Sequence, residues 1–469
     1  MKMILKIKVK RMMKMKYILG ALLAVTLLAS CKVGKSYVRP EMQLPDSLSA
    51  NQDSVSMADR QWTAVYTDST LRALIDRALE HNKDMLIAAA RVKEMAAQKR
   101  ISIANLLPQL NGKVSAEREL ENYGGHSKDY SNTYQAKALF SWELDLWGNL
   151  RWKKVAAMAD YLKSVEAQRA LRMTIVAEVA RAYYELVALD AELDIVRRTQ
   201  EAREEGVRLA RIRFEGGLTS ETSYQQAQVE LARTATLVPD LERRISLKEN
   251  DLAFLAGEFP NRLARSRFLS DMNVPQTLPV GLPSGLLERR PDVRAAEQGL
   301  IAKHAQVKVA YTNMFPRLTL TGQFGLESDV LKQFLESPYA LFNGLIATPL
   351  FNMGKNRAAL KAEKAAFEAE VHNYEKAVLT AFKEARNAIV DFHKIQEVYE
   401  LRLKLERSAK NYVDLAQLQY INGVINYMDV LDAQRGYFDA QIGVSNAMRD
   451  ELIAVVNLYK ALGGGWQVD

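Results

Sequence analysis

The chain has 469 residues, of which 48% are apolar and 26% are charged, so it can bury the cores of two or three domains. Its formal net charge of +8 and its pI near 9.2 are values that nucleic-acid-binding proteins often have. Seven of the basic residues, however, lie in residues 1–30, which contain no acid, and removing them leaves about +1 for the remainder. The positive charge therefore belongs to a targeting segment, which excludes a nucleic-acid partner.

Residues 1–30 combine this basic start with an apolar run, 17–29, that is too short to span a membrane comfortably as a helix. They are predicted to be a lipoprotein signal peptide, because Leu28-Ala29-Ser30 precedes Cys31 as in a bacterial lipobox. Cys31 is the only cysteine and is predicted to carry a covalent diacylglycerol and an N-acyl lipid. An incidental or buried cysteine is the alternative. With one thiol, intrachain disulfides are excluded.

Residues 31–68 are predicted to be a lipid-anchored N-terminal arm, extended and polar as far as about residue 60, with prolines at 40 and 45. A first structural repeat follows at 69–256, and its opening helices stop before Pro108. The remaining predicted elements of this repeat are β-barrel strands at about 109–118 and 134–146 and long helices at about 150–212 and 219–255.

The second of these strands alternates between two kinds of side chain. Its apolar set includes Tyr134, Phe140 and Trp142, and the polar set between them includes Gln135, Lys137 and Glu143. Alternation over ten or more residues with aromatic residues toward the ends is typical of a membrane-spanning β-strand, with the first set facing lipid and the second facing water. A half-buried strand of a soluble protein is the alternative.

Residues 257–291 contain five of the twelve prolines and are predicted to be a linker between repeats, strapped across the surface. The order of elements then recurs in a second structural repeat at 292–462. Its elements are a helix ending before Pro316, β-barrel strands at about 317–326 and 339–351, long helices at about 355–422 and 426–462, and then a C-terminal tail at 463–469. A period of about 200 residues indicates a duplication of helix, two strands, long helix and return helix.

The segment 355–422 holds no glycine or proline and carries a heptad pattern of apolar residues. As one helix it would be roughly 100 Å long. Four strands per chain cannot close a barrel, and an open sheet edge in lipid leaves backbone groups unpaired. The predicted fold is therefore mainly α with a membrane β-barrel portion, in a trimer whose 12-stranded β-barrel continues into a barrel of 12 helical rods.

Both long helices end in glycine-containing turns, which we expect to lie together at the tip farthest from the membrane. The tip residues predicted to form a gate or a docking surface are Gly216, Gly217, Thr219, Ser220, Gly423, Asn426, Tyr427 and Asp429. In a trimer, three Asp429 carboxylates could ring a narrow opening and repel one another. Ordinary hairpin turns are the alternative for the glycines.

Catalysis has little support in the sequence. The five histidines are scattered, without the paired spacing of a metal site: His81, His126, His304, His372 and His393. The run Gly463-Gly464-Gly465-Trp466 lacks the lysine of a phosphate-binding loop. We therefore predict no catalytic, cofactor or metal site, and no enzymatic activity.

A series of short motifs follows Cys31 along the whole chain. They are Trp142-Glu143-Leu144-Asp145-Leu146-Trp147-Gly148, the segment 282–292 around Arg289-Arg290-Pro291, Phe315-Pro316-Arg317-Leu318-Thr319, Val430-Leu431-Asp432-Ala433-Gln434-Arg435, and Asn457-Leu458-Tyr459 with the segment to Trp466. Together they resemble the TolC-like outer-membrane efflux lipoproteins. Some members carry an acid where this chain has Ile425, which puts a charged ring at that position in doubt.

The resemblance implies a trimeric exit duct in the outer membrane of a Gram-negative bacterium, lipid-anchored and extending into the periplasm. Its implied partners are outer-membrane lipid, a periplasmic adaptor protein and an inner-membrane transporter of the resistance–nodulation–division type. It would passively conduct drugs or other small toxic compounds. The alternatives are a duct for metal cations or for secreted proteins, a periplasmic adaptor, or a structural coiled-coil lipoprotein of the periplasm.

Overall fold

The computed structural model describes residues 33–45, 56–121, 129–265, 278–281 and 283–466. The predicted signal peptide and Cys31 lie outside these residues. The chain divides into two compact units. Within the described residues, unit 1 consists of 33–41, 91–164 and 295–374, and unit 2 consists of 42–90, 165–294 and 375–466. The long helices contribute residues to both units.

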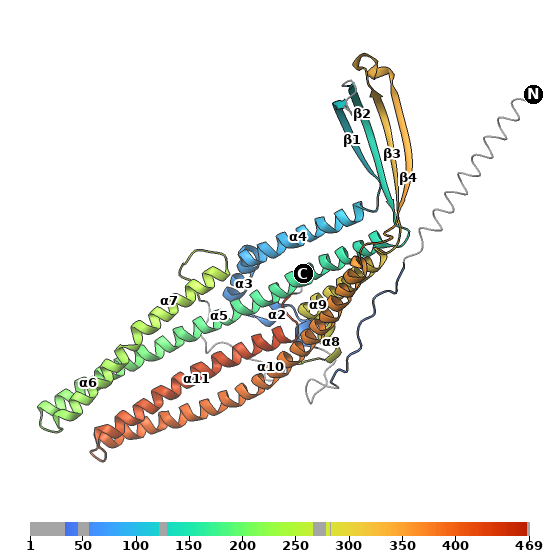
Figure 1. Cartoon of the computed structure of the whole chain (residues 1–469). Helices are drawn as coiled ribbons and strands as arrows, with labels where there is room; N and C mark the ends of the chain where they lie inside the picture. Colours follow the sequence, from blue (N-terminus) through green and yellow to red (C-terminus); the bar gives the residue numbers. More distant parts are fainter. Residues whose placement is uncertain (1–32, 46–55, 122–128, 266–277, 282, 467–469) are drawn as a thin grey trace, which may run out of the picture. The chain divides into compact units, whose positions relative to one another are not determined.

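Unit 1 contains an antiparallel sheet whose four strands follow chain order (Figure 1). The strands are β1 (Gln109–Glu121), β2 (Asp129–Leu144), β3 (Arg317–Ser328) and β4 (Pro338–Ala347), with the short helix η3 (Leu331–Glu336) between the last two. One row of paired residues crosses all four strands, from Leu110 through Phe140 and Gly322 to Phe342. A Cβ added at Gly322 would be in ordinary van der Waals contact with both neighbours, 3.6 Å from Phe140 and 3.7 Å from Phe342.

Helices lead into and out of this sheet. They are α4 (Lys83–Ala104), α5 (Asn149–Glu215), α9 (Pro291–Thr312) and α10 (Lys355–Ile421). Pro108 and Pro316 follow the ends of α4 and α9, where a proline stops the helix and the strand begins. In unit 1, Trp152 and Ala156 of α5 pack against Ala305 of α9.

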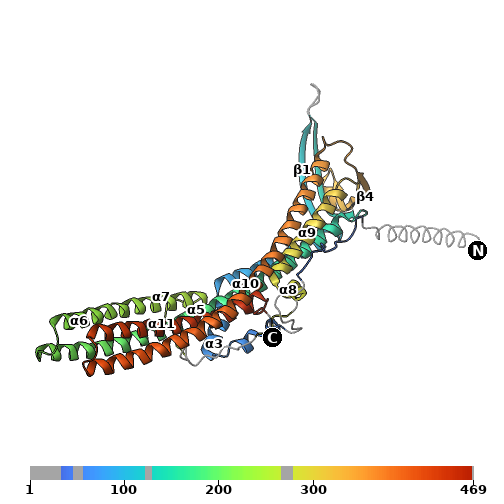
Figure 2. The ribbon, with the colours of Figure 1, turned by 90° about the horizontal axis from the view of Figure 1, so that it is seen from below.

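Unit 2 is helical. Its elements, besides the remaining parts of the long helices, are η1 (Met57–Asp59), α2 (Trp62–Val65), α3 (Ser69–His81), α6 (Glu221–Ala235), α7 (Leu237–Leu255), α8 (Pro283–Arg289) and α11 (Tyr427–Ala461). Figures 1 and 2 both show α6 and α7 beside α5, and α11 beside α10. Ion pairs such as Arg197–Glu242 and buried apolar residues such as Leu193 and Leu241 join α5 to α7.

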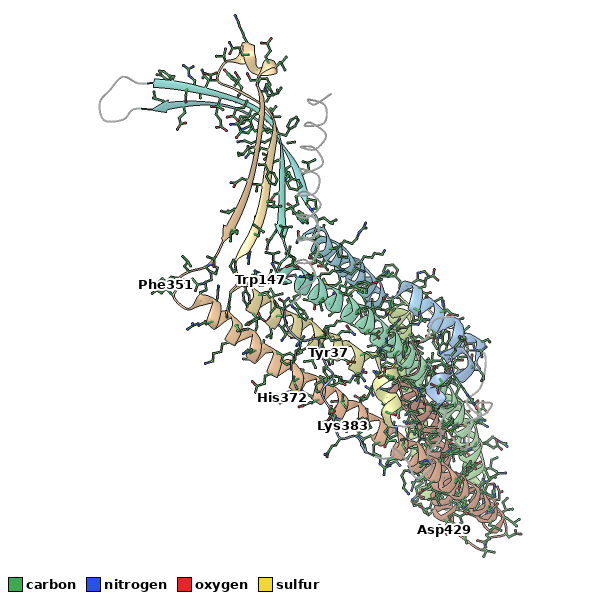
Figure 3. The ribbon with its side chains drawn as sticks, turned by 90° about the vertical axis from the view of Figure 1, so that its right-hand side faces the viewer. Tyr37, Trp147, Phe351, His372, Lys383 and Asp429 are labelled. Atoms are coloured by element: carbon green, nitrogen blue, oxygen red, sulfur yellow. The ribbon has the colours of Figure 1, made fainter. Side chains whose placement is uncertain are left out.

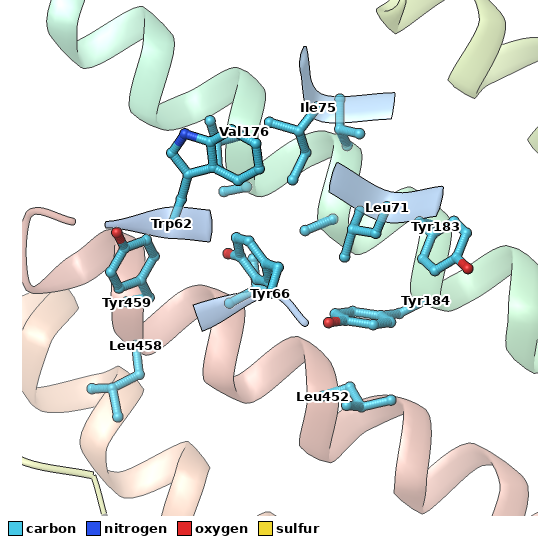
Figure 4. Packing of buried hydrophobic residues seen from close by; sticks show 14 of the residues in the cluster. Trp62, Tyr66, Leu71, Ile75, Val176, Tyr183, Tyr184, Leu452, Leu458 and Tyr459 are labelled. Carbon is cyan, nitrogen blue, oxygen red and sulfur yellow. The ribbon is translucent and has the colours of Figure 1, made fainter. Parts of the chain in front are cut away.

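The core of unit 2 joins segments that are distant in sequence (Figure 4). Trp62 and Tyr66 from the short N-terminal helices meet Val176 of α5 and Tyr459 of α11, and the rings of Tyr66 and Tyr459 lie edge to face at 6.1 Å. Asp68 caps α3 by accepting from the N–H groups of its first turn and also accepts from the hydroxyl of Tyr183 at 2.8 Å. Aromatic burial of this kind fixes the ends of the helices around one cluster.

Three sequence predictions about these elements need correction. The return helix predicted at 219–255 is two helices that meet at Thr236, because Pro239 has no N–H to donate to the preceding turn. The part of the arm predicted to be extended, as far as about residue 60, already contains the short helix η1, whose Met57 is buried in the core of unit 2. The linker at 257–291 is more than a surface strap, since it contains α8 with its buried Leu286.

Strand boundaries also differ from those predicted. The first strand extends to Glu121 instead of ending at 118, and the fourth ends at Ala347 instead of 351, just before Pro349. Among the described residues, no helix combines the length and the apolar character needed to cross a membrane. The same residues hold no group of three or more His, Cys, Asp and Glu side chains that could bind a metal ion.

Candidate channel wall and helical tip

Paired residues on neighbouring strands point to the same side of a sheet. In unit 1 this places most apolar side chains on one face and most polar ones on the other. The apolar face carries Leu110, Val114, Phe140, Trp142, Leu320, Phe324, Phe342 and Ile346. Five of these side chains are exposed, Val114 at 85% and Phe342 at 72% among them, while Phe140, Trp142 and Leu320 are half-buried. An exposed apolar face across four strands is typical of a surface that contacts lipid.

The opposite face carries the polar set together with three leucines, Leu139, Leu341 and Leu345. Lys137 lies in an ion pair with Glu327, and its ammonium sits 3.9 Å from the centroid of the Tyr339 ring. Lys137 is buried by these neighbours although it lies on the surface of a sheet. The register puts Gln135, Lys137 and Glu143 together on this face, on the side opposite Phe140 and Trp142, which is the arrangement expected of a water-facing wall.

The outer edges of β1 and β4 have no strand partner within the described residues. β1 pairs only with β2 and β4 pairs only with β3 in the sheet order of the described residues. Most side chains of β4 are exposed. An edge of this length exposes a row of unpaired N–H and C=O groups, which cannot remain unpaired in a lipid bilayer.

The junction between sheet and helices is built from the motif around Trp147 (Figure 3). Asp145 accepts from the N–H groups of Leu150 and Arg151, both at 2.9 Å, and so caps the start of α5. The indole of Trp147 stacks on Phe315 with 5.0 Å between centroids and donates to the carbonyl of Pro316 at 2.8 Å.

The N-terminal arm is attached at the same junction. The N–H of Val33 donates to the carbonyl of Trp147, and the indole of Trp152 donates to the carbonyl of Val33 at 2.8 Å. Further along, Arg39 forms a bidentate ion pair with Glu297, both contacts being 2.7 Å. The described arm therefore starts at the base of the sheet, two residues after Cys31.

At the helical tip in unit 2, both long helices end in the same turn. The N–H of Leu218 donates to the carbonyl of Arg213, and that of Val424 donates to Gln419, with Gly217 and Gly423 both at φ +73°. This is the Schellman motif, in which the left-handed residue is most easily a glycine. Gly216 is not left-handed, so only one glycine of that pair is required by the backbone.

The residues after Gly423 have structural partners of their own. Asn426 and Asp429 form a capping box at the start of α11, each side chain accepting from the backbone N–H of the other, at 3.3 and 3.2 Å. Tyr427 is buried against Tyr420, with 5.3 Å between ring centroids, and burial raises the pKa of its phenol to about 12. The side chain of Asp429 is therefore held at its own helix start (Figure 3).

The predicted residues Thr219 and Ser220, at the first tip turn, make fewer side-chain hydrogen bonds than Asn426 and Asp429 at the second. Ser220 is the N-cap residue of α6, but its side chain makes no capping hydrogen bond. The hydroxyl of Thr219 is buried without a hydrogen-bond partner. The two turns are nevertheless close, because Ala210 and Ala227 of the first hairpin share one apolar cluster with Tyr420 and Tyr427 of the second.

A buried charge cluster behind the tip was not predicted from the sequence. Glu230 of α6 contacts Arg435 of α11 at 2.7 Å and Arg203 of α5 at 3.3 Å, with Arg233 also at 3.3 Å. Burial raises the pKa of Glu230, but the three guanidinium groups outweigh that effect and leave its pKa lowered. Arg435 ends one of the motifs singled out above, which was the only sequence signal for this cluster. The cluster ties three helices together near the tip.

Comparisons with known proteins agree with this geometry. A sequence profile described as outer membrane efflux protein matches residues 74–258 and again residues 282–464, one match for each repeat. The toluene efflux pump outer membrane protein TtgI of Pseudomonas putida is 32% identical over 461 residues, covering 95% of this chain and 97% of that protein. The cation efflux system protein CusC of Escherichia coli is 28% identical over 449 residues, covering 94% and 97%.

The structural comparison gives the same result. The outer-membrane channel OprN matches with a TM-score of 0.87 and 28% identity, over 93% of this chain and all of OprN. The predicted fold class and the predicted resemblance are confirmed. The chain therefore belongs to the outer membrane efflux protein family, and it is an efflux channel of the Gram-negative outer membrane, not an enzyme.

Proposed function

We propose that three copies of this chain form one closed duct, anchored by lipid on Cys31, that serves as the exit of a tripartite drug efflux pump. The observation that carries the proposal is the four-stranded sheet with an exposed apolar face, a polar opposite face and two open edges. Pairing β4 of each copy with β1 of the next removes every edge and yields twelve strands. A water-filled barrel of that size suits a passive channel.

The other components of the pump are inferred from the family. An efflux channel of the outer membrane has no energy source of its own, so an inner-membrane transporter, here of the resistance–nodulation–division type, must drive export. A periplasmic adaptor would connect that transporter to the helical tip, where the two hairpin turns lie together. The residues proposed to dock the adaptor or gate the tip are those of the two turns and the start of α11: Gly216, Gly217, Thr219, Ser220, Gly423, Asn426, Tyr427 and Asp429.

Small toxic organic compounds are the proposed cargo, as the name of TtgI states for that relative. Metal cations are the second candidate, because CusC is named as part of a cation efflux system. Export of proteins is a third. A wide aqueous duct discriminates little between cargoes, so specificity is expected to lie in the transporter.

Conductance and export test the proposal together. Purified protein in planar bilayers should produce stepwise ionic currents, and the chain should lower ethidium accumulation in its parent bacterium relative to a deletion strain. Growth of the deletion strain with copper or silver salts distinguishes a channel for metal cations from a channel for drugs. A protein that forms no pores, or a deletion strain that accumulates no more ethidium and resists no fewer drugs, would contradict the proposed function.

A further inference from the structure

The helices of unit 2 line a cavity that the proposed function does not use. It lies between parts of α5, α7, α10 and α11, next to the segment that follows α7, and has a volume of about 1240 Å³. Ligand pockets in proteins typically have volumes on the order of 300–1,000 Å³. The cavity is therefore large enough to hold a drug-sized molecule together with water.

Much of the cavity lining is apolar. Aliphatic and thioether side chains come from three helices, namely Val187, Ala191 and Leu193 of α5, Ile245 of α7, and Val444 and Met448 of α11. Four of these six side chains are only half-buried, so they keep apolar surface that a ligand can cover. Covering that surface favours a ligand with hydrocarbon rings or chains.

The cavity also contains two carboxylates that share one cation. The Nε of Arg265 contacts Asp190 at 2.7 Å, and its Nη1 contacts Glu249 at 2.6 Å, so this group of three side chains keeps one negative charge. Burial raises the pKa of Asp190, although the hydrogen bond from Arg265 opposes this effect. A further positive charge nearby would stabilise the ionised form of Asp190.

Glu406 of α10 provides another carboxylate without a cation. It accepts a hydrogen bond from the hydroxyl of Tyr437, and it forms no ion pair with any residue that the structure describes. A phenol hydrogen bond leaves the charge of the carboxylate in place. Glu406 is therefore a second uncompensated negative charge at the cavity.

The remaining charged residues of the lining do not reverse this balance. Arg198 pairs with Asp194 at 2.7 Å, and the guanidinium of Arg262 is exposed, where water and salt screen it. The whole lining has five acidic residues and three arginines, which leaves two negative charges in excess. This balance favours a cation over an anion.

A buried hydroxyl group in the lining also lacks a partner. Ser445 is 9% exposed, and its Oγ has no hydrogen-bond partner among the described residues. Buried polar groups are nearly always hydrogen-bonded, either to protein or to a bound molecule. A ligand with an N–H group could donate to this oxygen.

We propose that this cavity binds a lipophilic organic cation, that is, a molecule with apolar rings and a positively charged nitrogen. The aliphatic lining contacts the rings, while Glu406 and the Asp190–Glu249 pair attract the charge. Arg265 acts as a positioning residue, because it holds Asp190 and Glu249 on the same side of the cavity. The site lies within one chain, so this inference goes beyond the proposed duct and does not depend on a trimer.

Direct binding of ethidium, a fluorescent lipophilic cation, tests the proposal. Purified protein in lipid nanodiscs should bind the dye saturably, as measured by fluorescence polarisation against protein-free nanodiscs. Glu406→Gln should weaken binding about five-fold or more, because it removes a charge and keeps the shape of the side chain. The matched control is Asp391→Asn, which removes an exposed carboxylate of α10 outside the cavity and should leave binding unchanged.

A second variant tests the location without changing any charge. Val444→Trp fills part of the cavity with an indole and should abolish ethidium binding, and thermal unfolding checks that the variant is folded. Anilinonaphthalene sulfonate, an apolar anion, should bind the parent protein at least several-fold more weakly than ethidium does. Each of these comparisons uses the full chain.

Three results would overturn the proposal: no saturable binding of ethidium, equal or tighter binding of the anion, or equal effects of the Glu406 and Asp391 variants. A protein with any of these results could still form pores and lower ethidium accumulation, so the proposed function would stand. Loss of pores and of export would contradict the proposed function instead, and the binding measurement on the purified protein would be unaffected.

Discussion

At the scale of single residues, the start of α11 combines two roles that a mutation must separate. Asp429 is a partner in a capping box and is also the residue proposed to ring the tip opening. Loss of either capping partner is expected to weaken the helix start by about 1 kcal/mol. Only loss of the carboxylate changes the charge at the opening.

We therefore expect Asp429→Ala, alone or with Tyr427→Phe, to raise single-channel conductance and drug leak without lowering trimer yield. Asn426→Ala is the matched control, because it breaks the same capping box and removes no charge. Single-channel recording compares the variants. Equal conductance in the Asp429 variants and the parent would move the gate elsewhere, and equal increases in the Asn426 and Asp429 variants would assign the effect to the cap.

Cys31 is predicted to carry the lipid that holds the arm at the membrane. Because Val33 is bonded to both Trp147 and Trp152, the attachment point lies within two residues of the sheet–helix junction. Cys31→Ser should abolish incorporation of labelled palmitate, while the barrel still retains the protein in the outer membrane. Mass spectrometry of the mature N-terminus provides the check: an unmodified Cys31, or cleavage at another site, would contradict the prediction.

Some residues of the tip were predictable and others were not. Gly217 and Gly423 have a local cause, since a helix that reverses direction needs a left-handed residue. The cluster of Glu230, Arg203 and Arg435 joins three helices. Amphipathic periodicity indicates which face of a helix is buried, but not which charged residue of a distant helix it will meet.

At the scale of elements, the two faces of β2 lead to opposite predictions for neighbouring residues. Phe140→Arg puts a cation on the lipid-facing side, where a position at the bilayer midplane costs about 2–4 kcal/mol. Ser141→Arg puts the same cation on the polar face, which tolerates charge. We expect Phe140→Arg to reduce the yield of heat-resistant trimers strongly and Ser141→Arg to leave it near that of the parent. Equal yields would contradict the assignment of the two faces, and a larger loss with Ser141→Arg would reverse it.

The pairing of α10 and α11 contains a buried acid that should make stability depend on pH. Burial raises the pKa of Glu451, and Glu400 raises it further, while a hydrogen bond from Gln396 opposes both effects. Tyr399 faces the same site, and its pKa is raised by burial and, to a smaller extent, by Glu451. An acid whose pKa is higher in the folded state binds its proton more tightly there than in the unfolded chain. The protonated form therefore stabilises the fold, and this stabilisation is lost as the pH rises above the ordinary pKa of 4.5.

Glu451→Gln should therefore raise the Tm of the purified protein at pH 7.5 by roughly one to two degrees and have no such effect near pH 4. The control is Glu397→Gln, an exposed residue paired with Lys394, whose loss should change stability little at any pH. Thermal unfolding followed by circular dichroism across this pH range measures both. A lower Tm for Glu451→Gln at pH 7.5 would mean that the charged form is the stabilising one.

The elements themselves were largely predictable because their patterns are long. Helix α10 has no glycine or proline, α5 has none from Asn149 to Glu205, and the alternation of β2 extends over more than ten residues. The wrong predictions lie where a single residue or a local composition was more informative, or less informative, than a long pattern. Pro239 divides the return helix, and α8 lies in a proline-rich segment whose composition resembles a linker.

At the scale of the whole molecule, the two repeats match in length, and the tip depends on that match. The apolar cluster at the tip draws on both hairpins, with Ala227 from one and Tyr427 from the other. Removing seven residues from each arm of one hairpin would displace its turn by about 10 Å relative to the other. Removing seven residues from both hairpins at the same level would keep the turns together.

We therefore expect the single-hairpin deletion to expose the tip to proteolysis and hydrogen exchange, and the matched double deletion to restore protection. A suitable level in the first hairpin is the Arg197–Glu242 ion pair, well away from the turns. Limited proteolysis with mass spectrometry of the tip peptides distinguishes the single-hairpin deletion from the matched double deletion. Equal protection in both would show that the hairpins are stable independently of each other.

Symmetry limits what one chain can reveal about the assembled protein. The duplication was visible in the sequence as paired motifs such as the segments before Pro108 and Pro316. The register within the sheet required the observed strand pairs, because side-chain alternation defines the face of a strand but not its alignment with a neighbour.

The open edges of β1 and β4 also have a consequence for the cell that makes this protein. A newly exported copy carries two strands that can pair with any extended polypeptide they meet, including another unfolded envelope protein. In the proposed trimer this hazard lasts until the copy has found two others, and that waiting time grows as copies become scarce. A chaperone that covers exposed strand edges would therefore protect the unassembled chain most when its level of synthesis is low.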